Sequence, residues 1–378
     1  MDGAKRTIRK DAISFLLYLL PILAFLNMVK YENKKFEIAI LLATLGAMAC
    51  LLVLTRVNRK PSVIVLLMFN AISLTITGIF YSSLGSIVQF LNLILMLFVF
   101  NEIAIEKKTY RRIHFLTFAL LIFYLMTLKI LDGNLSHIHD FWGNKVNPNL
   151  VSVLFFAAFL HLMCWLDAFN IPKLVGFPIK VAAAIFFLIK IDQYESRSIL
   201  ISFALFLVLA IFVRKDMKFI RIKGIVVTVL IISVVFSLIY VLMHIRLGDD
   251  VKILGKSLYT GREIIWKSAF EQISDNPIFG SGNVSKFESI HGTTTYASHH
   301  TVLGLWKILG IVPLLTFVFC LVRKRTGIAP ANELRLPKII MISVLPICFF
   351  ESFYIDAAIY VYFTLFLLRH TEKEREVK

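Results

Sequence analysis

Residues 223–244 read KGIVVTVLIISVVFSLIYVLMH, and this stretch decides the class of fold. From Gly224 to Met243 it contains no charged side chain. A helix of about 20 apolar residues is long enough to cross the hydrocarbon core of a bilayer, which is about 30 Å thick. Because lipid offers no hydrogen-bond partners to the backbone, such a run predicts a transmembrane helix.

The rest of the chain has the same character. Of its 378 residues 58% are hydrophobic, and the mean hydropathy is +0.79. We therefore expect a single integral membrane domain over residues 1–378, all-α and polytopic, in place of two or three soluble domains. The pattern predicts about twelve spans, at 12–29, 36–54, 62–80, 84–101, 113–131, 149–166, 174–191, 198–213, 223–244, 300–322, 339–351 and 355–369. The last two are short and form a hairpin.

The net charge of +17 argues against nucleic acid as a partner, because the basic residues fall in short clusters between the apolar runs. Cytoplasmic loops of membrane proteins carry an excess of lysine and arginine. With both termini in the cytoplasm, nearly every loop obeys this rule. The first apolar run lacks a small-residue cleavage site and is expected to be the first span. The four cysteines lie inside apolar runs and predict neither disulfides nor a metal site: Cys50, Cys164, Cys320 and Cys348.

The longest polar gap separates the ninth and tenth predicted spans, and we expect residues 246–299 to form one large extracytoplasmic loop. It contains TGREIIWKSAFEQISDNPIFGSG, which begins at Thr260. Thr260 and Glu263 form a T-x-x-E capping box before an apolar run. Apolar residues then recur every four positions, which predicts a short amphipathic helix over about 261–275 at the outer membrane surface. Asn276-Pro277 is expected to end it.

Two arginines are candidates for binding phosphate. Arg197 opens the eighth predicted span on the outer side, where the charge rule disfavours a cation, and Arg262 lies in the first turn of the amphipathic helix. A guanidinium presents a rigid fork of donors that fits phosphate oxygens. The plainer alternatives are an arginine that extends to the interface, for Arg197, and a surface ion pair, for Arg262.

Histidines at the start of the tenth predicted span are candidates for a general base. His299 and His300 can be polar caps, or one of them can accept a proton, since imidazole titrates near neutral pH. A zinc site joining them to His137 and His139 is disfavoured, because no spacing matches a known ligand set. His161, midway along the sixth span, is expected to face the bundle interior, in a hydrogen bond to another helix or in a catalytic role.

Other polar features are less specific. Glu351 and Asp356 lie at the turn of the last hairpin, as solvated turn residues or as groups that bind an acceptor. Gly280-Ser281-Gly282 lacks the flanking strand and lysine of a nucleotide-binding loop, so we expect it to turn the chain. No outer D-x-D pair is present to hold a divalent cation on a nucleotide sugar.

Taken together, GREIIW, NPIFGSG and SHHTVL, with Gly310 eleven residues after His299, resemble the signature of the O-antigen polymerase and O-antigen ligase superfamily. The SRSIL at residues 196–200 resembles the arginine-bearing start of the span two before the large loop in these bacterial proteins. One departure is His300, where the family often has asparagine; the spacing to Gly310 favours His299 as the family histidine.

The resemblance implies a membrane-embedded glycosyltransferase with a GT-C-like architecture in the bacterial cytoplasmic (inner) membrane. It implies a polyprenyl-diphosphate-linked oligosaccharide as donor, with no metal and no cofactor. His299, Arg262 and Arg197 would be catalytic. The substrate-binding candidates are His300, Trp266, Gly280, Gly282, Glu351 and Asp356. A flippase and a chain-length regulator are further candidate partners, besides the bilayer itself.

Three functions stay open at this level. A polymerase of capsule, exopolysaccharide or O-antigen repeat units is favoured. The lysine-, isoleucine- and phenylalanine-rich composition is typical of an AT-rich genome, and in a low-GC bacterium a capsule or exopolysaccharide polymerase is favoured over a lipopolysaccharide ligase. An O-antigen ligase would show the same motifs. A flippase or other transporter is disfavoured, because inverted repeats and polar interrupted helices are not evident.

Overall fold

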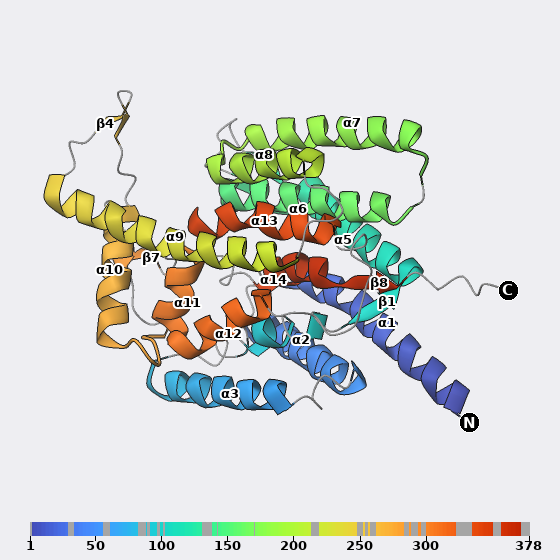
Figure 1. Ribbon diagram of the computed structural model, residues 1–378, viewed down its shortest axis with the longest axis horizontal. Helices are drawn as coiled ribbons and strands as arrows, with labels where there is room; N and C mark the ends of the chain where they lie inside the picture. Colours follow the sequence, from blue (N-terminus) through green and yellow to red (C-terminus); the bar gives the residue numbers. More distant parts are fainter. Residues whose placement is uncertain are drawn as a thin grey trace.

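The computed structural model describes residues 2–28, 34–55, 61–81, 88, 91–96, 99–100, 103–130, 138–141, 143–169, 171–212, 219–247, 252–253, 256–257, 262–282, 287–288, 294–295, 300–322, 335–350 and 357–371. Helices dominate these ranges (Figure 1). They are α1 (Asp2–Met28), α2 (Lys34–Thr55), α3 (Pro61–Tyr81), α5 (Lys107–Thr127), α6 (Pro148–Asp167), α7 (Lys173–Asp192), α8 (Arg197–Phe212), α9 (Phe219–Leu247), α10 (Arg262–Asp275), α11 (Thr301–Leu309), α12 (Ile311–Val322), α13 (Arg335–Phe350), α14 (Ala357–Thr364) and the 3-10 turn η5 (Leu365–Leu367).

Five of the described helices are long and apolar enough to cross a membrane. The stretches are Ile8–Met28, Lys35–Thr55, Pro148–Asp167, Leu174–Asp192 and Val227–Leu247. Shorter apolar stretches occur at Leu67–Thr77 and over α8. The expectation of a polytopic helical membrane protein is confirmed, whereas the number of twelve spans stays a prediction.

One predicted span is wrong as a single helix. Residues 300–322 form two helices, α11 and α12, which meet at Gly310. Gly310 has φ of +83°, a left-handed value that ends a helix and that side chains rarely adopt. α11 has nine residues and is only about 14 Å long, so it cannot cross the bilayer by itself. The apolar run was correctly identified, but its glycine breaks the helix.

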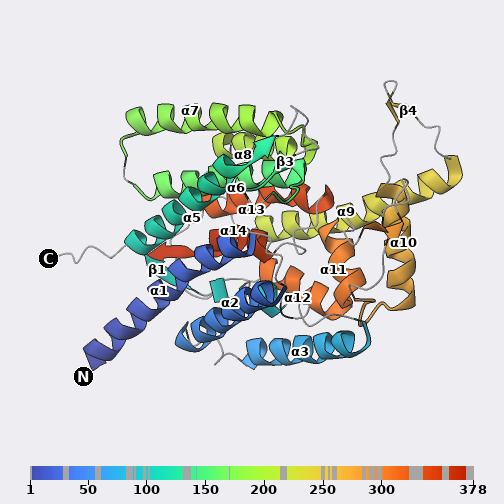
Figure 2. The same ribbon diagram turned by 180° about the vertical axis from the view of Figure 1, so that it is seen from behind.

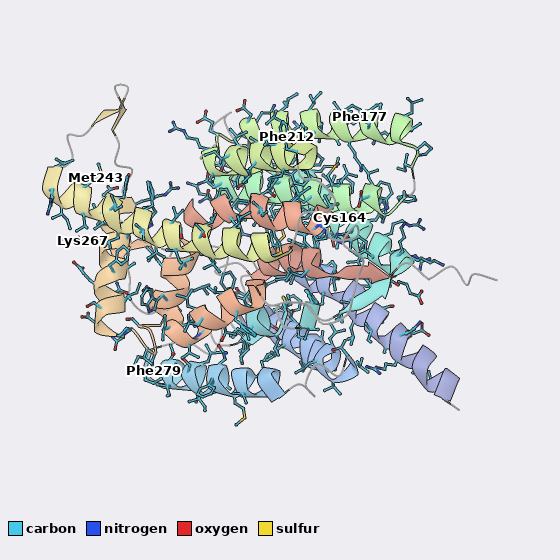
Figure 3. All side chains as sticks on the ribbon, viewed as in Figure 1. Cys164, Phe177, Phe212, Met243, Lys267 and Phe279 are labelled. Atoms are coloured by element: carbon cyan, nitrogen blue, oxygen red, sulfur yellow. The ribbon has the colours of Figure 1, made fainter. Side chains whose placement is uncertain are left out.

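α6 is the central helix of the bundle. Most of its length is buried, and it packs against α5, α7 and α8. Phenylalanine rings join it to α8: Phe159 lies 4.7 Å from Phe203 and 5.3 Å from Phe206 between ring centroids. α7 covers one side of the bundle, and its Phe177 is 70% exposed at the outer edge (Figure 3). In a membrane protein such an exposed apolar face lies against lipid.

The strands are short and pair locally, except for one pair. The local pairs are antiparallel: β2 (Lys129–Ile130) with β3 (Ile138–His139), β4 (Lys252–Ile253) with β5 (Lys256–Ser257), and β6 (Phe287–Glu288) with β7 (Thr294–Thr295). In contrast, β1 (Ala104–Glu106) is parallel to β8 (Arg369–Thr371). This pair joins the segment before α5 to the segment after α14 beside α1 (Figure 2).

The N-terminal part of α1 lies at the same end of the molecule as the β1–β8 pair (Figures 1 and 2). Lys10 of α1 forms an ion pair of 3.4 Å with Glu106 of β1. The start of α1 and the strand β8 therefore lie at the same end of the bundle.

Candidate functional site

The candidate site is built on α9, which is longer than a bilayer requires. Its 29 residues give a helix of about 43 Å, against about 30 Å for the hydrocarbon core. α10 and α11 pack against α9, and α10 lies near its C-terminal end (Figure 1). The long segment after α9 therefore folds back onto the helix that it leaves.

α10 uses its apolar stripe to bind these two helices. Ile265, Trp266, Ala269 and Ile273 are buried together with Val241 of α9 and Leu303 of α11. The opposite face is polar, and Lys267 and Glu271 are exposed there within 4.0 Å of each other. We had expected this stripe to lie on the membrane surface, but it is covered by protein. The four-residue spacing predicts an apolar face without showing what the face contacts.

Arg262 is the first residue of α10 and is half-buried. It lies one helical turn before Trp266, whose ring is almost completely buried. Trp266 contacts Tyr240 of α9 and His300, with ring centroids at 5.4 and 5.7 Å. Trp266 therefore packs between α9 and the start of α11. Its buried ring is not exposed for stacking on a sugar.

His300 is the N-cap of α11 and is 1% exposed. Its Nδ1 accepts a hydrogen bond from the backbone N–H of Leu303 at 3.3 Å, and its Nε2 lies 3.4 Å from the carbonyl oxygen of Ser233 in α9. Since Nδ1 accepts, the ring proton is on Nε2, which donates to Ser233. The ring contact with Trp266 places the start of α11 beside the first turns of α10, where Arg262 lies.

The other end of α11 is fixed by two glycines. A Cβ on Gly310 would lie 1.9 Å from the carbonyl oxygen of Ile278, and a Cβ on Gly280 would lie 2.6 Å from the nitrogen of Gly310. Both residues have positive φ, +83° and +73°. Only glycine permits backbones to approach this closely in this conformation. The NPIFGSG loop therefore crosses the α11–α12 junction in direct backbone contact. We call this contact between the backbones of Gly280 and Gly310 the glycine crossing.

Hydrogen bonds hold the glycine crossing together. Ser281 N–H donates to the carbonyl of Lys307 at 2.6 Å, and Gly282 N–H donates to that of Ile308 at 3.1 Å. The indole of Trp306 donates to the carbonyl of Pro277 at 3.0 Å. Gly280 and Gly282 thus use their backbones to fasten the loop to α11. Their expected contact with substrate stays a prediction.

The crossing also reaches α3. Thr77 donates its hydroxyl hydrogen bond to the carbonyl of Phe279 at 2.6 Å, and Asn70 donates to Thr316 of α12 at 2.7 Å. Phe279 lies near one end of α3 (Figure 3). An early helix of the chain therefore supports the late signature segment.

Arg197 is the first residue of α8 and is exposed. α8 packs against α13, α6 and α7, whereas α10 packs against α9 and α11. α13 contacts both α8 and α9. Arg197 and Arg262 thus begin helices with different neighbours, while Arg262 and the start of α11 are held together.

Several predicted residues lie outside the described residues. These are His299, Glu351 and Asp356, together with Thr260 of the capping box and His137. Their expected roles stay predictions.

Two buried polar residues were missed or left open by the sequence. Lys307 of α11 is 1% exposed. A lysine within GLWKILG is unusual for an apolar run, and this could have identified it.

His161 is buried in α6, with Nδ1 2.7 Å from Nδ1 of His114 and Nε2 3.1 Å from the carbonyl of Tyr362. These bonds confirm the interpretation of His161 as a link between helices.

The fold and the signature segments define a polytopic helical membrane protein whose late segment packs α10 and α11 on a long α9. Comparison with known families gives the next step: residues 182–318 match the family model of O-antigen ligase. This stretch contains α8 to α11 and all of the described signature residues. Residues 182–318 are thus similar to a domain of the O-antigen ligase and polymerase superfamily, which acts in membranes. A search of curated proteins and a search of solved structures gave no match.

Proposed function

We propose that this protein is a polysaccharide polymerase that joins polyprenyl-diphosphate-linked repeat units at the outer face of the bacterial cytoplasmic membrane. The observation that carries the proposal is the contact between Trp266 and His300. It holds the first turn of α10, with Arg262, beside the first turn of α11, to which His299 is joined through His300. An arginine beside the start of α11 suits binding of a donor diphosphate, and we infer that His299, which precedes the N-cap of α11 in the sequence, acts there as the base.

In the proposed reaction an acceptor hydroxyl oxygen attacks the anomeric carbon of the donor sugar. The bond between this carbon and the diphosphate oxygen breaks, and the polyprenyl diphosphate leaves with the electron pair. Arg262 neutralises the charge that grows on this leaving group. Its half-buried position strengthens the interaction, because partial burial reduces screening by water. His299 takes the proton of the acceptor hydroxyl.

Arg197 binds the diphosphate of the second lipid-linked chain in this scheme. In a polymerase both the donor and the acceptor carry a lipid diphosphate, so two arginines on helices with different neighbours each have a substrate group. A guanidinium fits phosphate oxygens in a bidentate manner. The exposed apolar faces of the helices offer surfaces for the polyprenyl tails.

A ligase is the second candidate, because the matching family model is described as an O-antigen ligase. A ligase transfers a completed chain to a final acceptor and needs one lipid diphosphate. The donor chemistry, with Arg262 and His299, would be the same.

The test is the polysaccharide made by cells that lack this gene and carry either the wild-type gene or His299→Ala. We expect His299→Ala to leave single repeat units on the outer surface without long chains. Full-length lipid-linked polymer that never reaches its final acceptor would identify a ligase. Repeat units held on the inner leaflet would contradict both and indicate a transporter. Lys267→Ala, on the exposed face of α10, is the matched control and should behave as wild type.

A further inference from the structure

His300 does not share the role that we propose for its neighbour His299. The first N–H groups of a helix lack partners within the helix, and an N-cap side chain satisfies one of them. His300 fills this position with Nδ1, which accepts from Leu303. Histidine is an uncommon N-cap; Ser, Asn and Asp lead the preference. Capping alone therefore does not explain why a histidine, with its longer side chain, stands at this position.

The second reason is the reach of the ring across the helix interface. From the N-cap of α11, Nε2 extends to the carbonyl of Ser233 in α9, and the ring edge meets Trp266 of α10. One side chain thus contacts all three helices of the candidate site. With one ring nitrogen accepting from Leu303 and the other donating to Ser233, neither nitrogen has a lone pair directed at a substrate.

α11 has little freedom to compensate for a change at His300. At its other end the backbone of Gly310 is in direct contact with Ile278, and Ser281 and Gly282 bond to the last turn. A nine-residue helix fixed at both ends behaves as a short rigid body. A change at the N-cap therefore shifts α11 relative to α9 and α10, and a displacement of about 1 Å within a site can lower a rate about 100-fold.

We propose that His300 is a positioning residue: it caps α11 and ties it to α9 and α10, so that α11 keeps its place beside the first turns of α10, without exchanging a proton itself. This inference rests on the proposed function, in which His299 is the base.

The experiment compares epitope-tagged His300→Asn, His300→Ser and His300→Ala in cells that lack the native gene. Asn and Ser restore an N-cap oxygen, whereas Ala leaves the N–H of Leu303 without its bond. We expect His300→Asn, which keeps the cap but loses the reach to Ser233 and Trp266, to lower polymer yield about 3- to 10-fold. His300→Ala, which loses the cap as well, should lower the yield about 10- to 100-fold. Yield is measured per tagged protein in the membrane, so that an unstable variant is not mistaken for an inactive one.

A pH profile separates positioning from proton transfer. Polymer formation is followed in membrane vesicles that contain the cells' own lipid-linked repeat units, over a range around neutral pH. If His300 only positions, His300→Asn keeps the wild-type shape of the profile. Loss of the acid limb in His300→Asn, or equal inactivity of the Asn, Ser and Ala variants, would overturn the inference.

His299→Ala in the same vesicles tests the proposed function separately. Wild-type activity of this variant would refute His299 as base. Inactivity of His299→Ala together with inactivity of His300→Asn would leave the proposed function standing and refute the positioning role. Wild-type yield from His300→Ala would refute it as well.

Discussion

At the scale of single residues, the two arginines differ in surroundings more than in chemistry. Arg262 is half-buried beside a packed helix start, and Arg197 is exposed at the first position of α8. A cation near low-dielectric surroundings acts more strongly on a phosphate than one in water. We therefore expect Arg262 to contribute more to the rate of transfer than Arg197.

Substitution of Arg262→Lys tests this expectation. Lysine keeps the charge but replaces a rigid bidentate fork with a single ammonium group. We expect polymer formation to fall about 10- to 100-fold in the vesicle assay, less than the roughly 100- to 1,000-fold cost of losing a transition-state donor outright, because lysine keeps the charge. The control is Lys267→Arg on the exposed face of the same helix, which should leave the rate unchanged. A rate for Arg262→Lys close to wild type would contradict the diphosphate contact.

At the scale of elements, the glycine crossing explains two glycine positions of the signature. Gly280 and Gly310 belong to segments that the chain separates by about thirty residues, yet their backbones touch. The contact sets how the NPIFGSG loop lies on α11 and how α11 turns into α12. These glycines support the site by packing.

Gly310→Ala should destabilise the protein strongly. A residue other than glycine at φ of +83° costs about 1–3 kcal/mol by itself. The clash with the carbonyl of Ile278 adds to this cost. We expect a lower midpoint of thermal unfolding in detergent, followed by tryptophan fluorescence.

The control is Gly46→Ala in α2, where a Cβ would meet nothing within 4 Å. Since alanine favours a helix by about 0.5–1 kcal/mol over glycine, this variant should be neutral or slightly more stable. Equal effects of the two substitutions would show that the crossing is not a constraint.

At the scale of the whole molecule, the parallel β1–β8 pair fixes how the ends of the chain relate. It joins residues before α5 to residues after α14, next to the start of α1. Basic residues gather at this end, including Arg9, Lys107 and Arg369. By the charge rule we expect this end to face the cytoplasm.

Accessible single cysteines test this orientation. Lys267→Cys on α10 should react in intact cells with a maleimide that cannot cross the membrane, whereas Lys10→Cys on α1 should react only after the cells are opened. Lys267 points away from the bundle (Figure 3), so its label should not be blocked by neighbouring helices. Labelling of both positions from outside would mean that the two ends are not separated by the membrane.

The resemblance to the superfamily and the helical membrane class could be read from the sequence, because long uncharged runs and short motifs are local properties. The run at 223–244 predicted α9, and the spacing of Ile265, Ala269 and Ile273 indicated the buried stripe of α10. Hydrophobic periodicity reports which face of a helix is apolar whatever the rest of the chain does.

Only the tertiary structure decided what these local features contact. The sequence could not show that the α10 stripe meets α9 and α11, that Gly310 breaks the tenth apolar run, or that His300 bonds Ser233, because each depends on atoms brought together from distant positions. Neighbouring histidines look alike in a motif. We propose different roles for them because the ring of His300 has two backbone partners, and a hydrogen-bonding group satisfied on both sides serves to hold structure in place.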